Sequence, residues 1–93
     1  MKGSMLDAEN LPKLERAQER LASIKVEKAR ARYEKYKDKE LSLSGALEHL
    51  QSEYAELMAA IPGLDTERIM GELADLSNMV DIFATLVLEY RDA

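Results

Sequence analysis

Apolar residues recur along this chain at intervals of three and four positions, and their density divides the chain into three segments. The apolar stripe is thin in residues 10–39, denser in residues 42–61 and almost continuous in residues 65–91. Intervals of three and four are the period of an amphipathic helix. Because glycine and proline are also scarce, the pattern predicts an all-α chain of three helices, the last two forming an antiparallel hairpin.

The first helix is expected to open near Pro12, since proline is tolerated in the first turn of a helix, and to run to about Lys39. Residues 10–93 are predicted to form a single helical domain. Residues 1–9 are predicted to be a disordered N-terminus outside it, because Met1-Lys2-Gly3-Ser4 before a second methionine is typical of an expression-tag remnant.

The boundaries of the other two helices carry capping residues. Ser42 or Ser44 is expected to cap the second helix, which ends before Pro62 and Gly63. Asp65 is a suitable N-cap for the third helix, which is expected to run to about residue 91. The short stretch between the two helices predicts a tight turn, and therefore helices that lie side by side.

Two features predict more than one subunit. A straight first helix would be about 40 Å long at 1.5 Å per residue, whereas a compact chain of this size has a radius of gyration of about 12–13 Å. The third helix is apolar on nearly all sides over residues 79–88. Three helices cover such a segment poorly, so we expect a homodimer or homotetramer that assembles into a helical bundle.

Charge is distributed unevenly around the net value of −5. Residues 13–39 carry ten basic and five acidic side chains, whereas residues 40–93 carry two basic and eleven acidic ones. An acidic chain without a nucleic-acid motif is not expected to bind nucleic acid. Without cysteine, and with its longest apolar run too short for a bilayer, the chain is expected to be a soluble cytoplasmic protein with no membrane partner.

Four acidic residues lie at mirrored positions about the predicted turn. Glu53 and Glu56 precede it, and Glu72 and Asp75 follow it, with a spacing of three within each pair. Folding the hairpin brings Glu56 level with Glu72, and Glu53 level with Asp75. Four converging carboxylates repel one another, and oxygen ligands select hard ions, so the pattern predicts a site for Mg²⁺ or Mn²⁺. Neutralising one of them, as in Glu53→Gln, is expected to stabilise the metal-free protein.

These motifs resemble those of the MazG-like family, the all-α nucleoside triphosphate pyrophosphohydrolases. Glu53-Tyr-Ala-Glu56 and Glu72-Leu-Ala-Asp75 match its E-x-x-E and E-x-x-D signatures, with a spacer of fifteen residues, and Asn78 matches a frequent family position. The resemblance covers roughly residues 28–91. It implies that Mg²⁺, held by the four carboxylates as catalytic and metal ligands, promotes hydrolysis of (d)NTP to (d)NMP and pyrophosphate.

Further residues are candidates for contacting the nucleoside triphosphate. Lys35 and Lys39 lie near the basic end of the first helix and are candidates for neutralising phosphate charge. Tyr54 is a candidate for stacking on the base, and Asn78 is a candidate substrate contact through the resemblance. Two other functions stay open: a non-enzymatic helical interaction protein, and a hydrolase of another pyrophosphate-linked nucleotide such as phosphoribosyl-ATP.

Overall fold

The computed structural model describes residues 7–92 and consists of three α-helices and one short 3-10 helix. The elements are α1 (Leu11–Tyr36), α2 (Leu43–Ala60), η1 (Ile61–Gly63) and α3 (Thr66–Asp92). Within the described range there is no strand, so the all-α prediction is confirmed. A hydrogen-bonded turn precedes α1, with the Leu11 amide donating to the Asp7 carbonyl at 3.1 Å. Residues 1–6, which belong to the predicted N-terminal segment, lie outside the described residues.

The predicted caps set the boundaries of the hairpin. The Ser42 hydroxyl accepts a hydrogen bond from the Gly45 amide at 3.1 Å, and the Asp65 carboxylate accepts one from the Arg68 amide at 3.2 Å. Between them, Leu64 adopts the left-handed conformation with φ 54°, and its amide donates to the Ile61 carbonyl at 3.1 Å. These contacts satisfy backbone groups that a helix end leaves unpaired and reverse the chain within a few residues.

The end of α1 differs from the prediction. The helix stops at Tyr36 rather than near Lys39, and the chain continues through a turn and a stretch without regular secondary structure to Ser42. The reason is the distance available for reversing direction. A helix that reached Lys39 would leave only Glu40 and Leu41 to turn the chain before the N-cap of α2.

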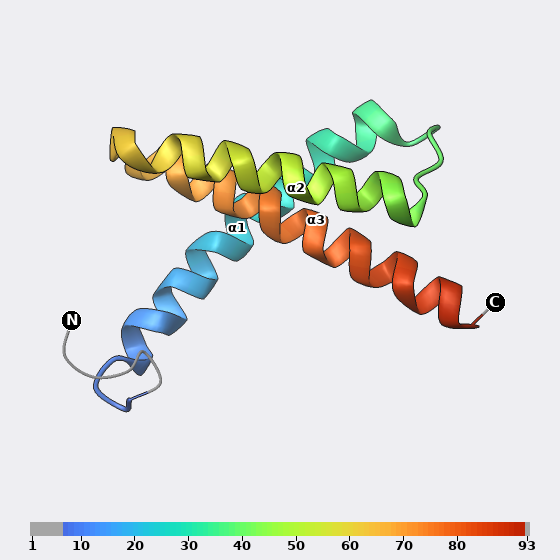
Figure 1. Cartoon of the computed structure of the whole chain (residues 1–93). Helices are drawn as coiled ribbons and strands as arrows, with labels where there is room; N and C mark the ends of the chain where they lie inside the picture. The colour runs from blue at the N-terminus through green and yellow to red at the C-terminus, as the bar shows by residue number, and fades with distance from the viewer. Residues whose placement is uncertain (1–6, 93) are drawn as a thin grey trace.

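The three helices form a small crossed assembly with α3 at its centre. Figure 1 shows α2 and α3 running antiparallel, and α1 passing across them at a steep angle. Alanine dominates the buried positions, at Ala46, Ala60 and Ala74, each 0% exposed, and among the residues whose burial is described Met79 is the one large side chain that is fully buried. Small side chains allow close helix approach, but they bury little apolar area. No described residue of α1 is buried, so burial of side chains contributes little to holding α1 against the hairpin.

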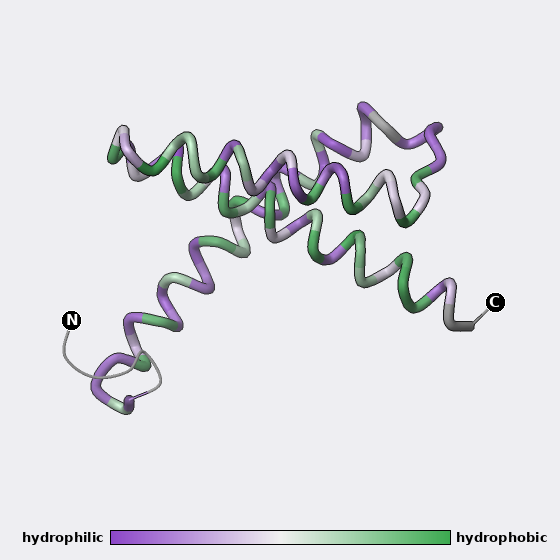
Figure 2. Tube along the Cα trace, in the orientation of Figure 1, coloured by the Kyte–Doolittle hydropathy of each residue, from purple (hydrophilic) through white to green (hydrophobic). Residues whose placement is uncertain are grey.

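The molecule is less compact than its length would allow. Its radius of gyration is 15.4 Å, against about 12–13 Å for a compact chain of this length. Large apolar side chains remain exposed along the hairpin, at Leu47, Tyr54 and Met58 on α2, at Ile61 in η1, and at Val80, Val87 and Leu88 on α3. Figure 2 shows the apolar character of the second half of α3. Among the described residues, no helix has the length and apolar character needed to cross a membrane.

Candidate metal site

Three carboxylates converge where α2 packs on α3. Glu53 and Glu56 are one turn apart on α2, Glu72 projects from α3, and one oxygen of each lies within 4.8 Å of the others. Glu53 is buried, Glu72 is half-buried and Glu56 is exposed. The mirrored spacing in the sequence therefore produces a group of three acids that could bind a metal ion. We refer to Glu53, Glu56 and Glu72 as the acid cluster.

The acid cluster has buried oxygens that the rest of the described chain does not satisfy. Glu53 Oε2 and Glu72 Oε2 are both buried, and neither has a hydrogen-bond partner among the described residues. Buried polar atoms are nearly always paired, because an unpaired one has lost its water without compensation. Two such oxygens in one cluster leave room for a cation as their missing partner.

Electrostatic repulsion within the cluster is visible at Glu56. Its pKa is raised above the ordinary value of 4.5, chiefly by the negative charge of Glu53. Desolvation and the charge of Glu72 raise this pKa further. The acid cluster is therefore crowded with negative charge, and a bound cation would relieve that crowding.

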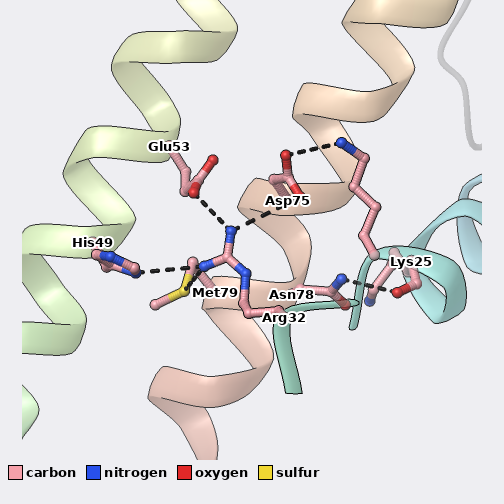
Figure 3. Close-up of polar contacts among 8 residues, drawn as sticks. Lys25, Arg32, His49, Glu53, Asp75, Asn78 and Met79 are labelled. Atoms are coloured by element: carbon pink, nitrogen blue, oxygen red, sulfur yellow. Dashed lines mark hydrogen bonds and ion pairs between the residues drawn. The ribbon is translucent and has the colours of Figure 1, made fainter. Parts of the chain in front are cut away.

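Asp75, the fourth acid of the predicted set, faces α1. Its Oδ2 lies 3.2 Å from Lys28 Nζ, and its Oδ1 lies 3.9 Å from Arg32 Nη2. The same Arg32 Nη2 donates to Glu53 Oε1 at 2.8 Å. The structure thus brings Glu56 and Glu72 together as the mirrored spacing implies. Between Glu53 and Asp75, however, it places the guanidinium of Arg32 (Figure 3).

Arg32 has further partners on α2 and α3. Its Nη1 lies 3.4 Å from His49 Nδ1 and donates to Met79 Sδ at 3.1 Å. Its side chain is only 19% exposed. Because α1 crosses both hairpin helices at this point, one guanidinium links all three helices beside the acid cluster.

A cavity of about 570 Å³ adjoins Glu53, Glu56 and Asp75, whereas Glu72 lines a different cavity of about 630 Å³. Its lining combines acidic side chains with the basic side chains that α1 contributes. The lining residues are Glu27, Lys28, Ala31, Arg32, Lys35, His49, Ser52, Glu53, Glu56 and Asp75. A cavity with both kinds of wall can hold a cation and a polyanion side by side, as a metal–phosphate complex requires.

The predicted substrate contacts are dispersed. Lys35 lines the 570 Å³ cavity. Lys39 lines a separate cavity of about 300 Å³ that also includes Met79. Tyr54 lies on the outer face of the hairpin, and Asn78 is buried and donates from Nδ2 to the Lys25 carbonyl at 3.0 Å. Of these four residues, only Lys35 lines the cavity beside the acid cluster.

Lys28 and Arg32 are site residues that were not predicted from the sequence. Their spacing offers a signal, because Lys25, Lys28, Arg32 and Lys35 recur at intervals of three and four on one side of α1. Lys25 pairs with Asp81 of α3 at 2.8 Å, which continues the same series of contacts. A basic stripe at helical spacing therefore indicates which face of α1 docks, but not which hairpin residues it meets.

Comparison of the chain with protein-family models, with curated proteins and with solved structures finds no match.

Proposed function

We propose that this protein is a Mg²⁺-dependent nucleotide pyrophosphohydrolase that cleaves (d)NTP to (d)NMP and pyrophosphate. The observation that carries the proposal is the acid cluster, with its two buried and unpartnered oxygens, beside a cavity with a basic wall. The resemblance of its motifs to those of the MazG-like family points to the same reaction. Substrates from the cellular nucleotide pool would place the enzyme in the cytoplasm.

The donor set fits a hard divalent ion. All three clustered side chains offer carboxylate oxygens, which Mg²⁺ and Mn²⁺ prefer. The net formal charge of the site also matches that of a divalent ion. The four carboxylates, with Asp75 included, and the two cations of Lys28 and Arg32 leave a net charge of −2. In the proposed site Glu53, Glu56 and Glu72 bind the ion, and Asp75 is the fourth ligand. Bound Mg²⁺ would supply Lewis acidity for hydrolysis of the phosphoanhydride.

The basic residues of α1 are proposed to bind the polyphosphate. Lys28, Arg32 and Lys35 line the cavity that Glu53 and Glu56 also line. These basic side chains, next to a metal held by the carboxylates, would hold the phosphates against the metal site and orient the bond between the α- and β-phosphates.

The test is a panel of nucleoside triphosphates and phosphoribosyl-ATP with Mg²⁺ or Mn²⁺, in which pyrophosphate and orthophosphate are measured separately. We expect pyrophosphate only. Glu72→Gln should lower kcat by two orders of magnitude or more, since loss of one charged ligand costs several kcal/mol of transition-state stabilisation. Glu89→Gln, an exposed change on the same helix, is the matched control. Release of orthophosphate alone, or equal turnover in both variants, would contradict the proposal.

The proposed functional unit is a homodimer or homotetramer that pairs through the outer face of the hairpin. A groove of about 350 Å³ between α2 and α3 is lined by Leu50, Gln51, Tyr54, Leu76 and Val80. Exposed apolar residues on both helices extend this face, and an apolar patch of this kind is characteristic of an interface.

Sedimentation of Val80→Glu tests the proposed assembly. We expect wild type to sediment as an oligomer at micromolar concentration and Val80→Glu to sediment as a monomer, because a charge would be buried in the interface. Val26→Glu on α1 is a matched control, since Val26 and Val80 are both 50% exposed. A monomeric wild type, or equal dissociation of both variants, would count against this face.

One observation favours a second candidate, a non-enzymatic helical interaction protein. The pairing of Arg32 with Glu53 and of Lys28 with Asp75 gives two of the four acids a structural role. Melting curves with and without Mn²⁺ separate the two functions, because an ion that binds only the folded state stabilises it by about 2.7 kcal/mol at a hundred times its dissociation constant. Absence of any shift, together with no turnover, would favour the interaction protein.

A further inference from the structure

The guanidinium of Arg32 occupies the position of a cation within the carboxylate group. It lies 2.8 Å from Glu53 Oε1 and 3.9 Å from Asp75 Oδ1, two acids that the mirrored motifs set level with each other. The side chains of Arg32, Glu53 and Asp75 are 19%, 11% and 16% exposed, so solvent screens their charges only weakly. The metal-free protein thus carries its own counter-ion at this point.

Glu53 faces two neighbours at once. Its Oε1 accepts a hydrogen bond from Arg32, whereas its Oε2 is buried without a partner. Glu53 also belongs to the acid cluster, together with Glu56 and Glu72. Mg²⁺ binds oxygen at about 2.0–2.1 Å with strict geometry. An ion that drew both Glu53 and Asp75 into its coordination would repel the guanidinium between them, so the two cations compete for the same carboxylates.

A guanidinium displaced by the metal would find a new binding partner in the neighbouring cavity. Arg32 lines the 570 Å³ cavity together with Lys28 and Lys35, next to the carboxylates that it would leave. A guanidinium binds phosphate oxygens through two parallel hydrogen bonds, which a lysine ammonium does not match. A phosphate group in this cavity would therefore replace the anionic partners that the metal takes from Arg32.

We propose that Arg32 is the phosphate-binding residue that links metal occupancy to nucleotide binding. In the metal-free protein Arg32 neutralises Glu53 and Asp75, and a divalent ion releases its guanidinium to bind the phosphate of the incoming nucleotide. The inference rests on the proposed metal site, and it adds an order of events: metal binding first, then phosphate binding. By linkage, each of the two ligands raises the affinity for the other.

The test uses Mn²⁺ alone and inorganic pyrophosphate as probes, with Arg32→Gln, Arg32→Lys and the control Arg30→Gln, an exposed arginine of the same helix. Without pyrophosphate, Arg32→Gln should bind Mn²⁺ about five- to tenfold more tightly, because the competing cation is gone, a change within the usual range of site-to-site coupling. With saturating Mn²⁺, the same variant should bind pyrophosphate about tenfold or more weakly, within that range. Arg32→Lys should keep the wild-type Mn²⁺ affinity but lose pyrophosphate affinity, and Arg30→Gln should match wild type.

A measurement on the wild-type protein covers the case in which Arg32→Gln fails to fold. The Nε–Hε resonance of Arg32 should shift when Mg²⁺ is added and shift again with pyrophosphate. Weaker Mn²⁺ binding by Arg32→Gln, or an Arg32 resonance unmoved by saturating Mg²⁺, would overturn the proposal while leaving the metal site standing. Absence of Mn²⁺ binding in wild type would instead overturn the metal site and the role of Arg32 together.

Discussion

Replacing Glu53 by glutamine should destabilise the metal-free protein, although the crowding of acids alone predicts the opposite sign. Glu53 joins Arg32 through a 2.8 Å hydrogen bond between side chains that are 11% and 19% exposed. A hydrogen bond to a charged group contributes about 1.5–3 kcal/mol, and a neutral replacement retains about 1 kcal/mol of it. Relief of the repulsion with Glu56 offsets part of the loss. We therefore expect a net cost of about 0.5–1.5 kcal/mol, with Arg32 left beside a neutral amide.

Thermal melting at pH 7 without divalent ions measures this cost. For a domain of this size, 1 kcal/mol lowers Tm by about 4–8 °C, so Glu53→Gln should melt roughly 2–12 °C below wild type. Glu48→Gln, an exposed change on the same helix, should melt with wild type. A Tm above that of wild type would refute the reasoning, because it would mean that repulsion within the acid cluster outweighs the pairing with Arg32.

Two other substitutions should stabilise the protein. Glu56→Gln should raise Tm at pH 7 but not at pH 4. The folded-state pKa of Glu56 is raised above its ordinary value of 4.5, so its ionisation destabilises the fold increasingly as pH rises from 4.5 towards the folded-state pKa. An equal gain in Tm at both pH values would contradict this reasoning. Leu64→Gly should raise the urea midpoint by the equivalent of about 1 kcal/mol, since a leucine at φ 54° is strained and this one is 80% exposed, so little burial is lost. An unchanged or lower midpoint would show that Leu64 is not strained in the turn.

The sequence predicts those parts of the structure that local chemistry determines. Ser42 and Asp65 cap the helices that they were expected to cap, because an N-cap acts within three residues. Glu53, Glu56 and Glu72 meet because a short turn between two helices leaves little freedom in their register.

The position of α1 could not be predicted from local sequence patterns. Hydrophobic periodicity identifies the apolar face of a helix, but α1 docks through Lys25, Lys28 and Arg32, whose partners lie on the other two helices. For this reason the engagement of Asp75 by α1 was missed, and Lys39 was expected on a helix that ends at Tyr36. Interhelical ion pairs depend on tertiary placement, which local propensity does not contain.

The contact pattern of α1 has a consequence for how the protein folds. The hairpin closes through η1, whereas Lys28 meets Asp75 across 47 positions of sequence and Lys25 meets Asp81 across 56. Contacts between distant residues form late, since closing a longer loop costs more entropy. The hairpin is therefore expected to form first, and its carboxylates to gather before any basic residue of α1 reaches them. At that stage Lys28 and Arg32 are not yet beside the carboxylates, so a divalent ion should increase the folding rate as well as the final stability.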